Sequence, residues 1–262
     1  MKNRTVAFID VLGFKEKIKN FSADELGKEY KRVLFYALEK YNLNIDFFKE
    51  ISFFKDVDRY CEYYVFSDSI ILTSFDDTIN SSFKLLIFTF KLARTMIAQG
   101  YSIRGAITFG EMFVDLQNSI FVGEALVKAY QLEYKQNWIG IVIDDSVIEQ
   151  FPSIFNFNYS LYPQYLKYLF VKYEVPFKEG KIIENFVINW RFNLIVEEGI
   201  KSLFPNANKE WSAKIKIDNT LQFSKYIKNN NLAYPIEKNC PLEIRTFYVG
   251  TNKPAFKNGD EL

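Results

Sequence analysis

The sequence predicts an α+β fold, a ferredoxin-like split βαβ arrangement in which a mixed sheet carries helices on one face. Two observations support this prediction. Short apolar runs bounded by Gly, Ser or Asp alternate with longer segments in which apolar residues recur at helical spacing. Between residue 4 and about residue 145 these segments follow the order β-α-β-β-α-β-(β)-α-β, which is the order of a split βαβ sheet.

The first segment, RTVAFIDVLGF (residues 4–14), predicts a strand that is covered on both faces and ends near a carboxylate. Val6 to Ile9 are apolar without alternation, as in a strand that is buried on both sides. Asp10 follows at a point where an unpaired carboxylate is costly to bury. Gly13 then indicates a sharp turn or a close backbone approach to a ligand. Asp10 therefore either caps the next helix or holds something cationic.

The next segments continue the alternation. Residues 23–42 predict an amphipathic helix, because apolar side chains recur there among lysines and glutamates. Residues 61–75 predict two strands joined by a tight turn at Ser67-Asp68-Ser69. A second helix is expected over residues 78–99, ending before Gly100 as the glycine that terminates it.

The last core segments complete the predicted sheet. Residues 101–115 predict a strand, a turn and a second strand, a third helix begins at Gly123, and WIGIVID (residues 138–144) predicts a further strand. From about Phe151 the sequence becomes rich in aromatic residues and proline, with weak periodicity. We therefore expect a core domain over residues 1–150 and a folded C-terminal extension of unassigned role over residues 151–262, packed on that core.

Composition limits the classes of function. The net charge of +1 gives little support for a nucleic-acid partner. No apolar run approaches the roughly 20 residues of a membrane span, and the N-terminus lacks the layout of a signal peptide. The two cysteines, Cys61 and Cys240, form no motif and suit a reducing compartment. We therefore expect a cytoplasmic protein with no membrane partner.

The chain contains no histidine. Ser-His-Asp hydrolysis, Cys-His chemistry and His-ligated zinc are therefore excluded. With only two separated cysteines, a thiolate metal site is not expected either. Any metal is then a hard cation on carboxylate and carbonyl oxygens, which means Mg²⁺, Mn²⁺ or Ca²⁺.

Asp10 and Asp68 are the candidate ligands for such a cation. In a split βαβ sheet the first strand lies beside the following hairpin, so the two strand-end aspartates can converge. Two bare carboxylates about 4 Å apart repel by around 4 kcal/mol at an effective dielectric constant of about 20, and a divalent cation between them removes this penalty. The turn Leu12-Gly13-Phe14 would offer backbone N–H groups to phosphate oxygens. The simpler alternative makes Asp10 a helix cap and Asp68 a turn residue.

Four stretches together resemble the class III nucleotide cyclases. FIDVLGF is similar to their first metal motif, VFSDSI to their hairpin with the second metal aspartate, and IRGAITFGEMFVD followed by FVGEALVKAYQLE to their later strands and helix. The resemblance covers about residues 4–145. It implies a nucleotide-cyclase fold in which Asp10, Asp68 and the Val11 carbonyl bind two Mn²⁺ or Mg²⁺ ions. It also places Arg104 on the triphosphate, and the alternative for Arg104 is a strand arginine that faces solvent.

Departures from the family pattern bear on which nucleotide base the protein would bind. Purine cyclases typically place a lysine four residues before the second metal aspartate, where this sequence has Tyr64. The positions of the usual asparagine and transition-state arginine hold Val127 and Gln131. The chain resembles the Pycsar pyrimidine cyclases better, in the stretches FIDVLGF, SDSI, RGAITFGE and GEALVKAYQLE. A bulky Tyr64 would disfavour a purine and could stack on or hydrogen-bond a smaller base. Plain strand packing is the alternative for Tyr64. Lys128 and Glu124 could assist the site or be surface charges.

The resemblance therefore implies an enzyme that converts UTP or CTP to the 3′,5′-cyclic nucleotide and pyrophosphate, as a second messenger in antiviral defence. It further implies a head-to-tail homodimer with sites at the interface, in which Tyr64 comes from the other chain. Three alternatives stay open at this stage. They are an adenylate or guanylate cyclase, a catalytically inactive nucleotide-binding module, and a palm-type polymerase, which the near-zero net charge does not favour.

Overall fold

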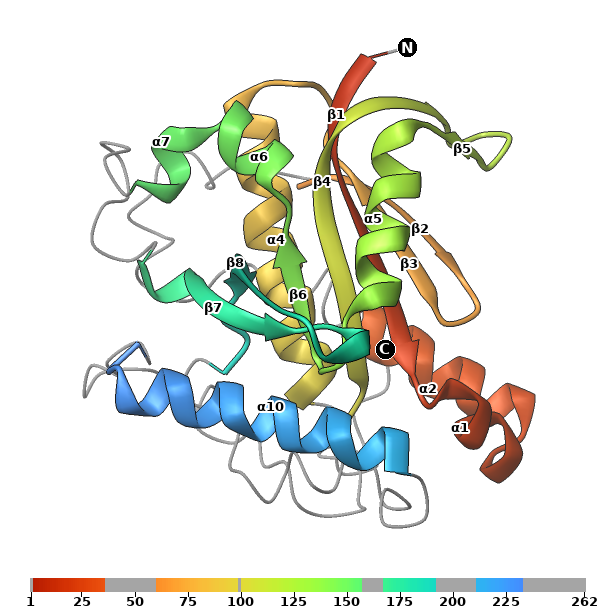
Figure 1. Cartoon of the computed structure of the whole chain (residues 1–262). Coiled ribbons are helices and arrows are strands. Elements are labelled where there is room, and N and C mark those ends of the chain that lie inside the picture. Colours follow the sequence, from red (N-terminus) through yellow and green to blue (C-terminus); the bar gives the residue numbers. More distant parts are fainter. Residues whose placement is uncertain (1, 36–59, 99, 157–166, 192–210, 233–262) are drawn as a thin grey trace, which may run out of the picture.

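The computed structural model describes residues 2–35, 60–98, 100–156, 167–191 and 211–232, and a mixed sheet lies at its centre (Figure 1). The strands follow the order β2-β3-β1-β4-β6-β8-β7, and β5 pairs with the far end of β4. The strands are β1 (Lys2–Leu12), β2 (Glu62–Phe66), β3 (Ser69–Thr73), β4 (Ser102–Asp115), β5 (Ile120–Val122), β6 (Gly140–Ile143), β7 (Phe170–Pro176) and β8 (Ile182–Ile188). The helices are α1 (Phe14–Asn20), α2 (Ala23–Phe35), α4 (Ile79–Ala98), α5 (Glu124–Lys135), α6 (Asp145–Gln150), α7 (Pro152–Phe155), α10 (Trp211–Asn229) and the 3₁₀ turn η3 (Lys178–Gly180). The predicted α+β fold with a mixed sheet is confirmed.

Strand β1 is central to this sheet. It pairs antiparallel with β3 on one side and with β4 on the other, while β4 runs parallel to β6. The prediction of a strand, a turn and a strand over residues 101–115 is wrong, because β4 is one continuous strand of 14 residues. Gly105 and Gly110 both lie in its extended register with β1, opposite Ile9 and Arg4, so neither glycine makes a turn.

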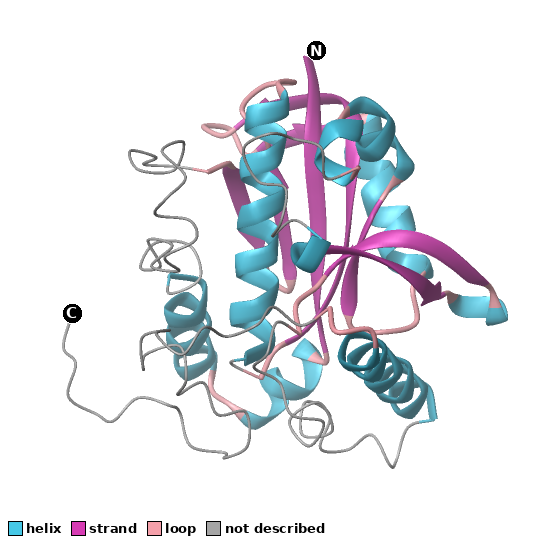
Figure 2. Cartoon of the chain, turned by 90° about the vertical axis from the view of Figure 1, so that its left-hand side faces the viewer, coloured by secondary structure: helices cyan, strands magenta, loops and turns pink. Residues whose placement is uncertain are grey.

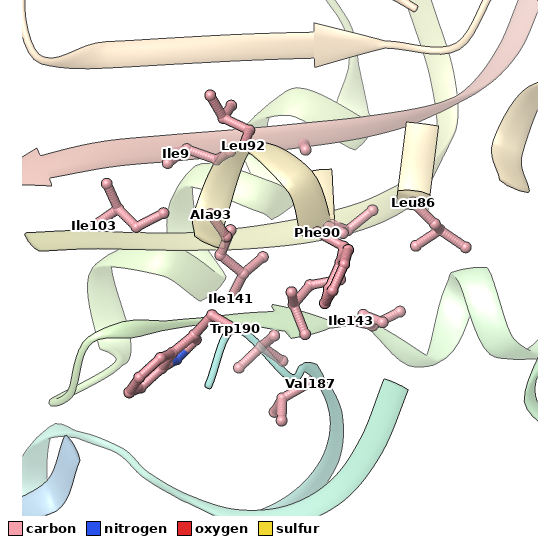
Figure 3. Packing of buried hydrophobic residues seen from close by; sticks show 14 of the residues in the cluster. Ile9, Leu86, Phe90, Leu92, Ala93, Ile103, Ile141, Ile143, Val187 and Trp190 are labelled. Atoms are coloured by element: carbon pink, nitrogen blue, oxygen red, sulfur yellow. The ribbon is translucent and has the colours of Figure 1, made fainter. Parts of the chain in front are cut away.

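Helices cover both faces of the sheet, and not one face as the sequence suggested (Figure 2). Ile9 of β1 belongs to the same buried core cluster as Leu92 and Ala93 of α4 (Figure 3). The preceding residue, Phe8, makes an edge-to-face contact with the ring of Tyr130 on α5, with the ring centroids 5.5 Å apart. Because neighbouring strand residues point to opposite faces, α4 and α5 lie on opposite sides of β1. This double cover agrees with the uninterrupted apolar run of the strand.

The predicted hairpin and the end of the second helix are confirmed. Strands β2 and β3 are joined through Ser67 and Asp68, with Phe66 opposite Ser69. Helix α4 ends before Gly100, whose φ of +81° is the left-handed geometry of a helix-terminating glycine. No helix in the described ranges combines the length and the apolar content that crossing a membrane requires. The structure describes helix α2 up to Phe35, and residues 36–42 of the predicted helix lie outside the described residues.

The region after residue 150 adds strands to the same sheet. Strand β8 pairs with β6 at Val142 and Ile143, and β7 forms the outer edge. From α10, Phe223 packs against Trp138, with ring centroids 5.0 Å apart. The expected division into residues 1–150 and 151–262 stays a prediction, but the strands on either side of it share one sheet and one core.

The close approach of β1 to Gly105 of β4 can be tested by substitution. A Cβ at this position would lie 2.8 Å from the Phe8 carbonyl oxygen and 3.0 Å from Cγ1 of Ile9. Gly105→Ala should therefore push the two central strands apart and lower the free energy of unfolding by about 1–3 kcal/mol, measured by urea denaturation. Gly110→Ala on the same strand is the control, because its nearest neighbour would be Ala125 Cβ at 3.6 Å. Equal losses in the two variants would contradict this account of the close approach.

Candidate functional site

Asp10 and Asp68 lie together at the edge of the sheet that is formed by the end of β1 and the β2–β3 turn. Asp10 is the third residue from the end of β1, directly between Ser69 of β3 and Arg104 of β4. Asp68 lies in the β2–β3 turn, and its carbonyl oxygen accepts a hydrogen bond of 2.8 Å from the Val11 N–H. The structure therefore brings the two predicted ligands together with Val11. Asp10 does not cap the next helix, because it is a strand residue and α1 begins only at Phe14.

The electrostatics of this edge favour a cation. Burial, together with the carboxylates of Glu133 and Asp68, raises the pKa of Asp10 to about 6, and the Arg104 guanidinium opposes the shift. The pKa rises because the folded protein places negative charges near one another in a partly buried position. A bound cation would reverse this effect, since it stabilises the ionised carboxylate.

The side chains around the aspartates fit a hard divalent ion. The hydroxyl of Tyr30, from α2, is buried and has no hydrogen-bond partner in the described part of the chain, and Asp68 and Asp10 are the charged groups that act on it. Within the described ranges no group of three or more His, Cys, Asp or Glu side chains could hold a metal. An ion at this edge would therefore be held by two carboxylates and by water molecules, some of which substrate oxygens can replace, which is the way Mg²⁺ is commonly held. Mg²⁺ or Mn²⁺ fits these donors.

The turn after β1 lies next to this acid pair. Gly13 has a φ of +75°, and α1 begins at the following residue. Leu12 is the last residue of β1, while Phe14 is buried with its ring 5.4 Å from that of Tyr30. The segment Leu12-Gly13-Phe14 thus lies beside Asp10, and its role in phosphate binding stays a prediction.

Arg104 is buried and ion-paired. Its Nε donates to Glu133 Oε1 at 2.5 Å, and its Nη1 donates to the Gln136 carbonyl oxygen at 3.0 Å. The alternative of a solvent-facing arginine is therefore wrong. The guanidinium lies on the Asp10 face of the sheet, but two of its donors are already committed to the end of α5. This pairing was not predicted from the sequence, and the role of Arg104 on the triphosphate stays a prediction.

Two residues that the sequence analysis missed hold Arg104 in place. Glu133 is 2% exposed and lies on the buried stripe of α5, four residues after Ala129, which in turn follows Ala125 by four. A glutamate at that spacing was the available sequence signal. Gln136, at the end of α5, is fully buried and donates to the Gly105 carbonyl at 2.8 Å, and its own side-chain oxygen accepts from Trp138 Nε1 at 2.9 Å. Nothing in the local sequence pattern distinguished Gln136.

A second cation reaches this region from the C-terminal part of the chain. Lys178, in η3 between β7 and β8, places its ammonium 3.6 Å from the centroid of the Tyr134 ring on α5. Partial burial and the nearby Arg104 lower the pKa of Lys178, while Glu133 opposes the shift. Lys178 therefore lies within electrostatic reach of the Arg104–Glu133 pair.

The other candidates on and near α5 have structural roles or face outward. Lys128 forms an ion pair of 2.7 Å with Asp144, which caps the start of α6, and Glu124 is exposed at the start of α5. Val127 and Gln131 are both exposed on the outer face of the helix.

Tyr64 lies on β2, on the same face of the sheet as Asp10. The register places it opposite Ile71, which is itself opposite Phe8. Its ring packs on that of Phe121 from β5, with centroids 5.1 Å apart, and the side chain stays partly exposed. Tyr64 thus lies level with Phe8 and not with Asp10, and two strands away from β1, or about 10 Å at the usual spacing between strands. Within one chain Tyr64 therefore packs as a strand residue, away from the acid pair.

No protein-family profile and no curated protein matches the sequence. Among solved structures, the chain is similar to the catalytic core of a rhodopsin-guanylyl cyclase with converted specificity in complex with ATPαS (12% identity, 71% of this chain, 95% of that chain, TM-score 0.47). It is also similar to the guanylate cyclase domain of RhGC from Catenaria anguillulae in complex with GTP (15%, 71%, 96%, TM-score 0.45) and to the adenylyl cyclase CyaB from P. aeruginosa (14%, 71%, 93%, TM-score 0.42).

The raised pKa of Asp10 predicts a pH dependence of stability. The folded carboxyl holds its proton up to about pH 6, while the unfolded group releases it near 3.8. The wild-type protein in EDTA should therefore be most stable with respect to this group below pH 4, and should lose that contribution as the pH rises to 6. Asp10→Asn cannot ionise and should unfold at a higher temperature than wild type at pH 7.

Thermal unfolding of both proteins between pH 4 and 7.5 measures this difference. Asp77→Asn, which changes an exposed aspartate, is the matched control and should follow the wild-type profile. Parallel profiles for wild type and Asp10→Asn would refute the electrostatic account.

The buried ion pair predicts a large stability effect at Glu133. Glu133→Gln leaves the Arg104 charge buried without its counter-charge, and should lower the free energy of unfolding by roughly 3 kcal/mol in urea titrations. Glu184→Gln removes the carboxylate of an exposed pair with Lys172 and should cost less than about 1 kcal/mol. If Glu133→Gln lowered the free energy of unfolding no more than Glu184→Gln, the Arg104–Glu133 pair would not be what fastens α5 to β4.

Proposed function

We propose that the chain is a metal-dependent nucleotide cyclase that converts a pyrimidine nucleoside triphosphate, UTP or CTP, to the 3′,5′-cyclic nucleotide and pyrophosphate. The observation that carries the proposal is the meeting of Asp10 and Asp68 at one sheet edge, with Arg104 on the adjacent strand. Paired carboxylates next to a fixed arginine suit phosphoryl transfer, because that chemistry needs positioning and charge neutralisation more than covalent catalysis. In this proposal the product serves as a second messenger in antiphage defence.

At the α-phosphorus, the reaction forms one P–O bond and breaks another. The ribose 3′-oxygen attacks the α-phosphorus, the bond from that phosphorus to the bridging oxygen of the β-phosphate breaks, and pyrophosphate leaves. The 3′-hydroxyl proton passes to an aspartate carboxylate or to water. Two Mn²⁺ or Mg²⁺ ions held by Asp10, Asp68 and the Val11 carbonyl would supply Lewis-acid activation of the hydroxyl and neutralise the leaving group.

The protein's own groups then position the triphosphate. The backbone N–H groups of Leu12-Gly13-Phe14 lie beside Asp10, where they can donate to phosphate oxygens. Arg104 contributes a fixed positive charge, and its remaining N–H donors are available once Nε and Nη1 are engaged. Lys178 adds a second positive charge from the β7–β8 connection.

In this proposal the base is bound across a homodimer. Tyr64 lies too far from the acid pair to act in the same chain, so we assign it to the site of the partner, where its ring would stack on a pyrimidine. Exposed apolar side chains on α5, the helix that covers this face of the sheet, support an interface there. These side chains are Val127, Tyr130 and Tyr134.

The runner-up is a cyclase-like module that binds nucleotide without turning it over. Its support is the commitment of Arg104 to Glu133, together with the absence of an arginine at Gln131. A purine cyclase keeps the chemistry and changes the base, and it has less support because Tyr64 stands at the position of the lysine typical of purine cyclases.

The full-length protein with Mn²⁺ and each of UTP, CTP, ATP and GTP tests the proposal. We expect release of cyclic pyrimidine nucleotide and pyrophosphate, resolved by chromatography and mass spectrometry. Asp68→Asn should reduce the rate at least 100-fold, because it removes a ligand of the ion and keeps the size of the side chain. Asp77→Asn serves as the matched control and should keep full activity.

Each outcome separates the candidates. Product from ATP or GTP alone would overturn the assignment of Tyr64 and leave the cyclase chemistry. Nucleotide binding without pyrophosphate release would favour the binding module. Equal rates for wild type and Asp68→Asn would reject the metal site.

A further inference from the structure

Tyr30 has a buried hydroxyl without a hydrogen-bond partner in the part of the chain that the structure describes. Tyr30 lies on α2, and its ring packs between Phe14, at 5.4 Å, and Tyr101, at 5.8 Å, measured between ring centroids. The residue is 8% exposed, and its hydroxyl oxygen has no hydrogen-bond partner anywhere in the described ranges. The ring is thus fully accounted for by packing, and the hydroxyl is not.

Such a group carries a cost in the folded protein. A buried hydroxyl without a partner destabilises the folded state relative to the unfolded chain, in which water hydrates it. A phenylalanine would fill the same ring position without that penalty. The neighbouring Tyr101 shows the usual solution, because its hydroxyl donates to Glu29 Oε1 at 3.0 Å. Tyr30 is the exception in this small aromatic cluster.

The surroundings of the hydroxyl connect it to the acid pair. Phe14 follows β1 directly after the turn at Gly13, so the aromatic cluster packs against the same sheet edge that carries Asp10. Besides burial, the carboxylates of Asp68 and Asp10 are the groups that raise the pKa of Tyr30. Neither carboxylate accepts a hydrogen bond from it. A buried donor under the electrostatic influence of two acids suits a hydrogen bond to a water molecule that is bound to a cation between them.

We propose that Tyr30 is a positioning residue of the metal site, whose hydroxyl donates a hydrogen bond to a water molecule bound to the ion held by Asp10 and Asp68. This inference rests on the metal site of the proposed function and adds to it a residue from α2. Partners in the second coordination sphere orient the ligands of a metal, and their loss typically weakens metal binding 10–100-fold.

Tyr30→Phe in the full-length protein tests the inference by two readouts that move in opposite directions. Mn²⁺ alone is the probe, titrated by electron paramagnetic resonance of the free ion. We expect the dissociation constant for Mn²⁺ to rise about 10-fold, because the hydrogen bond to the bound water is lost. In EDTA the thermal midpoint should stay equal or rise, because the variant no longer buries an unpaired hydroxyl.

Tyr101→Phe is the matched control, since it removes a hydroxyl from the adjacent ring of the same cluster. It should lower the thermal midpoint in EDTA, because it breaks the bond to Glu29, and should leave Mn²⁺ affinity unchanged. Equal Mn²⁺ affinity of Tyr30→Phe and wild type would overturn the role of Tyr30 while the metal site stands. A midpoint of Tyr30→Phe that falls as far as that of Tyr101→Phe would assign Tyr30 a structural role instead. Failure of the wild type to bind Mn²⁺ would overturn the inference together with the metal site, and the cyclase assay then judges the proposed function separately.

Discussion

The antiparallel register of β1 between β3 and β4 is the constraint on which the candidate site depends. It places Asp10 opposite Ser69 on one side and Arg104 on the other, while the Val11 N–H ties the backbone of Asp68 to the same point. Side chains alternate between faces, so a slip of one residue would turn Asp10 into the core beneath α4. Backbone pairing, and not attraction between the site residues, therefore holds the two acids together.

This arrangement concentrates unfavourable terms at one edge of a well-packed sheet. The Asp10 carboxyl has a raised pKa, the Arg104 charge is buried against Glu133, and the Tyr30 hydroxyl has no partner within the described residues. Elsewhere the core is closed by large apolar side chains from both halves of the chain, among them Trp138, Trp190 and Phe223. The rigid sheet thus tolerates local charge repulsion that a ligand can relieve, as sites prepared for binding commonly do.

The sequence allowed a prediction of those features that depend on local pattern. The first strand, the hairpin with Asp68 and the helix that ends before Gly100 follow from apolar runs and turn residues, and the structure has all three. The glycines of β4 led to the wrong prediction of a turn within residues 101–115. In sequence, a glycine that permits close strand packing looks like one that makes a turn. Arg104, Glu133 and Gln136 come together only through tertiary packing, and no spacing rule announces that a hydroxyl such as that of Tyr30 will be left without a partner.

Strand β8 lies directly against β6, which is itself the neighbour of the strand that bears Arg104. The turn beyond β7 also delivers Lys178 to the end of α5. Strands β7 and β8 are therefore an integral part of the sheet. Any change that displaced β8 would uncover the polar backbone edge of β6 and disturb the hydrogen-bond ladder that leads to the acidic residues. Sequence divergence in this part of the protein should thus be confined to positions that leave that seam intact.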